Sequence, residues 1–159
     1  MSYRVADLRP GDIILVVGRS LLAKAIQCST ASPFSHAALV GDGVLWQAEW
    51  HVETAALDTY AETGWVYRPV DPPPGTVADA LAWVAAQRGR RYGLTELLLD
   101  ALRFDAHVVP RVRRPLRHWT CSGLIAAAFA QAGWPLTRAP WSAPVDLAYS
   151  PRLTPIPMD

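Results

Sequence analysis

Hydrophobic and polar positions along the chain change their period several times, and each change indicates a new element of secondary structure. The apolar run "IILVV" from Ile13 to Val17 follows a Pro-Gly-Asp turn signal and is typical of a short buried strand. The next stretch, "SLLAKAIQCST", has apolar residues at helical spacing and predicts a short helix. We therefore expect a strand followed by a helix near the start of the chain.

The stretch "SHAALVGDGVLWQAEW" predicts a β-hairpin, since two β-prone runs flank a Gly-Asp-Gly turn. Side chains alternate between the two faces of a strand, which places His36 on one face with Ala38 and Val40. On the returning strand, Gln47 and Glu49 share a face. A histidine and a Gln/Glu pair can therefore meet across neighbouring strands.

The remaining patterns predict strands and helices without a regular order. "WVYRPV" is a strand candidate, "TVADALAWVAAQ" indicates a helix capped by Thr76, and a second helix is expected from about Thr95. The Ala- and Leu-rich stretch from Ser122 to Ala132 predicts a buried helix, and the Pro-rich end after it predicts a short edge strand. Such a mixture favours an α+β fold. No internal repeat or linker divides residues 1–159, so we expect a single domain.

Composition narrows the class of protein. Of the 159 residues, 51% are hydrophobic and 18% are charged, which is typical of a globular domain with its own core. The formal net charge of +1 gives no reason to expect a nucleic-acid partner. No apolar run approaches the roughly 18 residues that a membrane span needs, and the start lacks a secretory signal pattern. We therefore expect a cytoplasmic protein, although a phage-encoded protein or one released by lysis would have the same features.

The histidines and cysteines do not form a recognisable metal site. The four histidines contain no HExxH pattern, and the two cysteines, Cys28 and Cys121, form no CxxC pair. The sequence therefore predicts neither a metal ion nor a cofactor. In a chain without an export signal, both thiols are expected to be reduced.

Cys121 has a special place because it lies at the first turn of a predicted helix. Free backbone N–H groups and the helix dipole favour negative charge there, so the pKa of the thiol can fall below its ordinary value of about 8.5. A lone cysteine can also be a small buried apolar residue, so a base must be found. His36 is one candidate and His118 is its rival. An arginine cluster before the cysteine is either a solvated loop or a feature that favours a thiolate or an anionic substrate: Arg111, Arg113, Arg114 and Arg117.

Four pieces of sequence occur in a fixed order: "RPGDIIL", "SHAALVGDGVLWQAE", "RRYG", and "WTCSGLIAAAF" followed by "APVDLAYSPRL". Together they resemble the permuted branch of the NlpC-like, papain-like cysteine amidases and peptidases, the group that contains the YiiX/YebB-like hydrolases. As in that branch, the histidine strand precedes the cysteine helix. The resemblance extends from about Leu8 to Leu153. It implies a circularly permuted papain-like fold, with an antiparallel sheet packed against helices and the nucleophilic cysteine at a helix N-terminus.

The resemblance also assigns roles to individual residues. Cys121 matches the nucleophile of the family and His36 matches its general base. The third polar residue of the family lies on the strand after the histidine strand, commonly just before an alanine, so Gln47 fits best. Many permuted members carry a carboxylate there, and Glu49 is the alternative on the same face.

Neighbours of these motifs are expected to contact the substrate. Ser35 opens the histidine strand, Trp119 and Trp50 flank the proposed catalytic residues, and Tyr92 matches a tyrosine that such proteins often carry upstream of the cysteine. Cys28 is expected to be a core or cleft-wall residue.

These roles imply a cysteine hydrolase that cleaves an amide bond in a peptide or cell-wall peptide through a thioester. A lipid-directed thiol acyltransferase or esterase resembling lecithin:retinol acyltransferase would use the same Cys/His pair, and the apolar segment "LTELLLDALRF" would suit a lipid. A non-catalytic binding module on the same fold is the third hypothesis. The expected partners are therefore a peptide, a peptidoglycan peptide or an acyl lipid.

Overall fold

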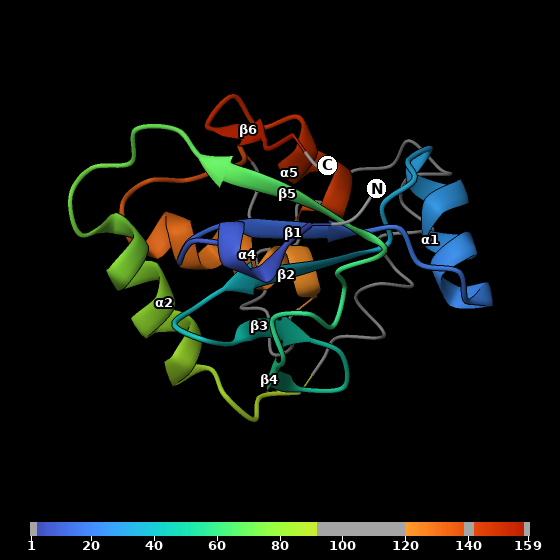
Figure 1. The fold of residues 1–159 in the computed structure, drawn as a ribbon, viewed down its shortest axis with the longest axis horizontal. Coiled ribbons are helices and arrows are strands. Elements are labelled where there is room, and N and C mark those ends of the chain that lie inside the picture. The colour runs from blue at the N-terminus through green and yellow to red at the C-terminus, as the bar shows by residue number, and fades with distance from the viewer. Residues whose placement is uncertain (1–2, 92–119, 139–141, 158–159) are drawn as a thin grey trace, which may run out of the picture.

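A six-stranded sheet forms the centre of the computed structural model, which describes residues 3–91, 120–138 and 142–157 (Figure 1). The strand order is β4-β3-β2-β1-β5-β6, and every neighbouring pair is antiparallel. The strands are β1 (Ile13–Val16), β2 (His36–Val40), β3 (Leu45–Ala48), β4 (Val52–Ala55), β5 (Gly64–Pro69) and β6 (Leu153–Pro155).

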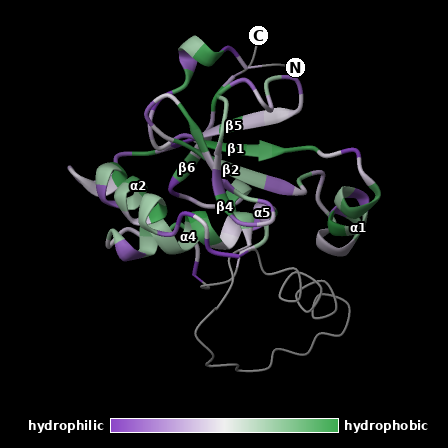
Figure 2. Cartoon of the chain, turned by 90° about the horizontal axis from the view of Figure 1, so that it is seen from below, coloured by the Kyte–Doolittle hydropathy of each residue, from purple (hydrophilic) through white to green (hydrophobic). Residues whose placement is uncertain are grey.

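The helices differ in how they lie against this sheet. α4 packs against β2, α2 and α5, whereas α1 lies beyond the end of the strands (Figures 1 and 2). The described helices are the short η1 (Val5–Asp7), α1 (Leu21–Thr30), α2 (Thr76–Ala86), α4 (Cys121–Gln131) and α5 (Pro144–Ala148).

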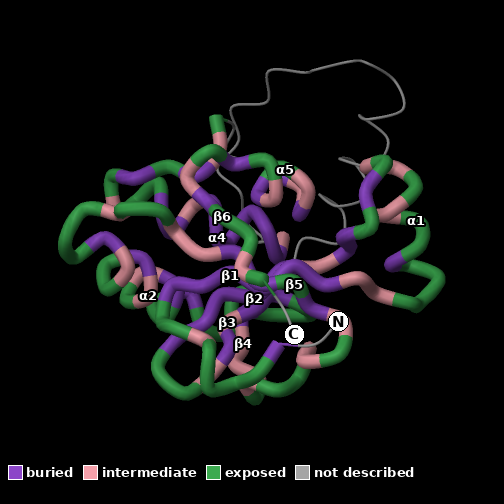
Figure 3. The backbone as a smooth tube through the Cα atoms, turned by 45° about the horizontal axis from the view of Figure 1, so that its top comes forward, coloured by how far each residue is buried: buried purple, intermediate pink, exposed green. Residues whose placement is uncertain are grey.

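Alternation along the central strands divides the core into two clusters. Ile13 and Leu15 of β1 belong to the cluster that contains residues of α2 and α4, whereas Ile14 and Val16 belong to a second cluster with Tyr3 on the other face. Because β1 is covered on both faces, it is apolar at every position, as the hydropathy colours also show (Figure 2). The central strands are buried, whereas Ala23 is the one buried residue of α1 (Figure 3).

Most of the predicted elements are confirmed. The first strand, the hairpin, the "WVYRPV" strand and the edge strand appear as β1, β2 with β3, β5 and β6. The predicted helices around residues 21–30, 76–87 and 122–132 appear as α1, α2 and α4. The helix predicted from about Thr95 lies outside the described residues.

Other expectations need correction. The patterns did not indicate β4 or α5, and α5 begins with Pro144, whose missing N–H is harmless in the first turn of a helix. Thr76 is not the cap of α2; the cap is Gly75, whose φ of 86° lies in the left-handed region. Cys28 is exposed and not a core residue. It lies about 140° around α1 from Ala23, which faces the body of the protein.

Candidate active site

The start of α4 holds the first element of the site. Thr120 is the N-cap, and its hydroxyl accepts a hydrogen bond from the backbone N–H of Gly123 at 3.0 Å. A Cβ at Gly123 would lie 2.5 Å from that hydroxyl oxygen, so a larger residue there would displace the Thr120 hydroxyl from its capping position. Cys121 follows the cap as the first helical residue and is only 3% exposed. The helix N-terminus therefore presents its positive end to the thiol.

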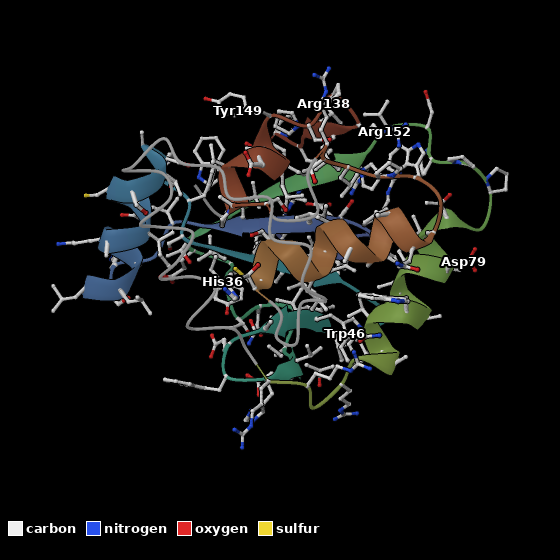
Figure 4. The ribbon with its side chains drawn as sticks, turned by 180° about the vertical axis from the view of Figure 1, so that it is seen from behind. His36, Trp46, Asp79, Arg138, Tyr149 and Arg152 are labelled. Atoms are coloured by element: carbon white, nitrogen blue, oxygen red, sulfur yellow. The ribbon has the colours of Figure 1, made fainter. Side chains whose placement is uncertain are left out.

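A histidine lies beside this thiol. His36 is the first residue of β2, at the end of the sheet toward which α4 begins, and Figure 4 shows it next to one end of α4. The imidazole and the Cys121 thiol are hydrogen-bonded to one another. The structure thus brings together the two residues that the motifs predicted as base and nucleophile.

The environment of the pair shifts both pKa values toward the charged forms. Burial alone would raise the pKa of Cys121, but the charge and hydrogen bond of His36 and backbone hydrogen bonds at Ala37 and Ser122 lower it. Burial alone would lower the pKa of His36, but the Cys121 charge and hydrogen bonds to Cys121 and Gln47 raise it. Both shifts therefore act in the direction that favours a thiolate facing an imidazolium.

Gln47 of β3 lies against the other side of the imidazole. Its Oε1 is 3.3 Å from His36 Nε2, and the residue is only 5% exposed. Because Nε2 faces this amide, Nδ1 is the nitrogen left for the thiol. An amide oxygen fixes the ring without adding charge to a buried site.

Tyr60 is a member of this network that the sequence analysis missed. Its hydroxyl lies 2.6 Å from Gln47 Oε1 and 3.2 Å from Glu49 Oε1, and its ring centroid lies 5.5 Å from that of His36. Burial and the neighbouring Glu49 charge raise the pKa of Tyr60, so the phenol keeps the proton that it donates. The residue lies in the turn between β4 and β5, and no motif marks that turn in the sequence.

Glu49 occupies a different position from the one predicted. β3 ends at Ala48, so Glu49 lies in an exposed bend and not on the strand face of Gln47. Its carboxylate accepts from Tyr60, and its charge makes only a small contribution to the raised pKa of His36. Of the two candidates for the third polar residue, Gln47 is the one that contacts the imidazole.

Of the residues predicted to contact the substrate, some line a cleft and others lie outside the described residues. Ser35 is buried, accepts a hydrogen bond from the Gly18 N–H at 3.0 Å and lines a cleft beside His36. Trp50 lines the same cleft. Tyr92 and Trp119 lie outside the described residues, as do the rival base His118 and the arginine cluster.

The cleft has a volume of about 310 Å³ and runs from His36 and Tyr60 toward α1. It gives a substrate access to the imidazole, whereas the buried Cys121 is not among its described lining residues. Its lining residues are Val16, Gly18, Ser20, Leu22, Ala23, Ile26, Ser35, His36, Ala48, Glu49, Trp50 and Tyr60.

The described residues contain neither a cluster of metal ligands nor a membrane-spanning helix. Within residues 3–91, 120–138 and 142–157, no three His, Cys, Asp or Glu side chains are grouped so that they could hold a metal ion. Among these described residues, no helix is both long and apolar enough to cross a bilayer.

Comparison with known proteins identifies the fold. The crystal structure of the metalloprotein YiiX from Escherichia coli O157:H7 (DUF1105) matches with a TM-score of 0.73 and 17% sequence identity, over 95% of this chain and 97% of that chain. No family model and no curated protein matches the sequence. The chain therefore has the YiiX-like α+β fold, which confirms the fold that the motif order predicted.

Proposed function

We propose that the protein is a cysteine hydrolase that cleaves an amide bond in a peptide or cell-wall peptide through a thioester. The observation that carries this proposal is the hydrogen-bonded pair of Cys121 and His36 at the start of a buried helix, with both pKa values shifted toward the ion pair. A decayed or purely structural site would have no need of this arrangement. The YiiX-like fold supports the same class of enzyme.

The first half of the reaction forms the thioester. The Cys121 thiolate attacks the carbonyl carbon of the scissile amide, and the negative charge moves to the carbonyl oxygen. The free N–H groups in the first turn of α4, that of Cys121 first, are placed to stabilise this oxyanion. The imidazolium of His36 donates its proton to the leaving nitrogen, the C–N bond breaks, and the amine departs.

The second half regenerates the enzyme. Neutral His36 takes a proton from a water molecule, whose oxygen attacks the thioester carbon. The C–S bond breaks, the carboxylic acid leaves, and the thiolate again faces an imidazolium. No step requires a metal; YiiX is described as a metalloprotein, but the described residues here offer no matching group of ligands.

Gln47 and Tyr60 act through His36 in this mechanism. The Gln47 carbonyl oxygen faces His36 Nε2, which keeps Nδ1 directed at the thiol. The Tyr60 hydroxyl donates to the same oxygen and so holds the amide in the orientation that accepts from the imidazolium. Both are positioning residues.

A second candidate function is acyl transfer or ester cleavage on a lipid. It uses the same nucleophile, base and thioester, and it differs in the acyl donor and in the acceptor of the second step. The apolar character of the cleft favours this candidate, since most of its lining side chains are aliphatic or aromatic.

The mass of a trapped adduct tests both candidates. Wild-type protein and Cys121→Ala are incubated separately with a peptide-amide library and with phospholipid vesicles, quenched in acid, and analysed by intact mass and peptide mapping. We expect a peptidyl adduct on Cys121 that Cys121→Ala lacks. A fatty-acyl adduct would select the second candidate. A complete absence of adducts and products dependent on Cys121 would contradict both.

A further inference from the structure

The cleft beside His36 has the chemistry of a binding site for an apolar group. Five aliphatic residues line it: Val16, Leu22, Ala23, Ile26 and Ala48. Trp50 and Leu22 are 72% and 55% exposed although they are large and apolar, and both lie on this cleft. Exposed apolar side chains gathered around a concave site are typical of a surface that a ligand covers.

The charge of the cleft disfavours an anionic group. The ionisable residues that line it are His36, Glu49 and Tyr60, and neither lysine nor arginine is among its described lining residues. A carboxylate or phosphate in the cleft would meet the Glu49 carboxylate, while the His36 imidazolium is already compensated by the Cys121 thiolate. An uncharged group meets no such penalty.

The wall formed by α1 is held in place by several hydrogen bonds. The Gln27 side-chain amide donates to the backbone carbonyls of Gly18 at 2.9 Å and Pro33 at 2.8 Å, which fixes the helix to the segments before and after it. The hydroxyl of Ser35 accepts from the Gly18 N–H. A Cβ at Gly18 would lie 2.6 Å from Ser35 Oγ and 2.7 Å from Ala23 Cβ, so the chain is closely packed here. The cleft is therefore preformed.

We propose that this cleft binds an uncharged apolar group of the substrate, next to the His36 side of the Cys121–His36 pair. The inference rests on the proposed thioester chemistry and adds the substrate class. The volume of about 310 Å³ is at the lower end of the range for ligand sites, so it fits one aliphatic side chain or a short acyl chain. Both sources present the same chemistry to the cleft.

Alkylation of Cys121 by a series of iodoacetamides tests the assignment without requiring turnover. The probes are iodoacetamide, N-hexyliodoacetamide, iodoacetyl-leucinamide and N-(5-carboxypentyl)iodoacetamide, and peptide mapping measures the rate at Cys121 and at Cys28. Burial of one methylene group corresponds to roughly a threefold to fourfold change in affinity. We expect the hexyl or the leucinamide probe to label Cys121 about tenfold faster than iodoacetamide, and the carboxylate probe to lose most of this advantage. The faster of the two apolar probes distinguishes an acyl chain from a peptide side chain.

Two adjacent leucines provide matched variants. Leu22 lines the cleft, whereas Leu21 is 87% exposed and is not among the residues that line it. Leu22→Ser should lower the ratio of hexyl to unsubstituted labelling at Cys121 by about threefold. Leu21→Ser should leave that ratio unchanged.

The outcomes separate the two proposals. If iodoacetamide labels Cys121 much faster than Cys28 but no apolar probe is favoured, the cleft assignment is wrong and the proposed nucleophile is retained. An equal effect of the two leucine variants would also overturn the cleft assignment. If no probe labels Cys121 faster than Cys28, the proposed function is contradicted. The cleft assignment, which rests on that function, is then contradicted as well.

Discussion

Two ionisable pairs, each with at least one buried partner, lie at opposite ends of β1. At one end, the Asp12 carboxylate is 1% exposed and accepts hydrogen bonds from Arg68 Nε at 2.8 Å, Arg68 Nη2 at 2.7 Å and the Arg9 N–H at 2.8 Å. At the other end, where Val16 of β1 pairs with the first residue of β2, the imidazole and the Cys121 thiol form the second pair.

The two pairs differ in what their protons can do. The guanidinium of Arg68 does not release its proton, and hydrogen bonding to Asp12 raises its pKa further, so this pair is fixed and structural. In the other pair a proton can lie on either partner, and His36 borders a cleft. Burial and charge therefore do not by themselves mark a reactive site. The second pair differs in having an exchangeable proton and one partner, His36, on the wall of a cleft.

The largest expected effect is on stability at the Asp12 end. Arg68→Met would leave a buried carboxylate without its cation, and we expect the free energy of unfolding to fall by about 3–5 kcal/mol in urea denaturation. Arg4→Met, which removes an ion pair between two exposed side chains, should cost less than about 1 kcal/mol. Alkylation of Cys121 per folded molecule should stay unchanged in both. Equal destabilisation by the two variants would contradict the structural role of the Asp12–Arg68 pair.

The next effect concerns the base. Without its imidazolium partner, Cys121 returns to at least the ordinary thiol pKa of about 8.5, where only a few per cent is thiolate at pH 7. His36→Ala should therefore slow alkylation of Cys121 at pH 7 by about 30-fold or more, as measured by rates of iodoacetamide labelling. His118→Ala should have little effect. The reverse ranking would make His118 the base.

A smaller effect is expected for the residues that hold His36. Gln47→Ala should lower turnover by about tenfold, since loss of the partner that orients a functional histidine typically lowers activity by this factor or more. It should also move the high-pH limit of turnover downward, because the hydrogen bond to Gln47 raises the pKa of His36. Glu49→Ala should change turnover by less than about threefold. If the Glu49 variant were the damaging one, Glu49 would be the orienting residue.

The smallest effect is predicted for Tyr60. Tyr60→Phe keeps the ring beside His36 and removes only the hydroxyl that donates to Gln47 Oε1. We expect a loss of about fivefold in turnover and a shift of the high-pH limit in the same direction as for Gln47→Ala, since one hydrogen bond contributes about 1 kcal/mol. A loss without any shift in the pH profile would show that Tyr60 acts only in packing.

The sequence was sufficient to predict most of the elements, though not β4 or α5, and the proximity of Cys121 and His36. Local patterns predict the hairpin and the buried α4, and the order of the motifs identifies Cys121 and His36 as candidates. The choice between Gln47 and Glu49 was beyond local patterns, because it depends on where β3 stops pairing with its neighbours. Tyr60 could not be found at all, since only tertiary packing brings a turn residue against a side chain that is 13 positions away in the chain.

The pH dependence of Cys121 alkylation tests the central claim most directly. Iodoacetamide labelling of Cys121 and of exposed Cys28 is followed by peptide mapping from pH 5 to pH 10, in wild-type protein and in His36→Ala. Because the pKa of Cys121 is lowered and that of His36 is raised, labelling of Cys121 should reach its plateau at a lower pH than that of Cys28. In His36→Ala, the rise should move up to or above the ordinary thiol range near pH 8.5. A Cys121 profile that rises with or after that of Cys28 in the wild-type protein would contradict an activated thiol.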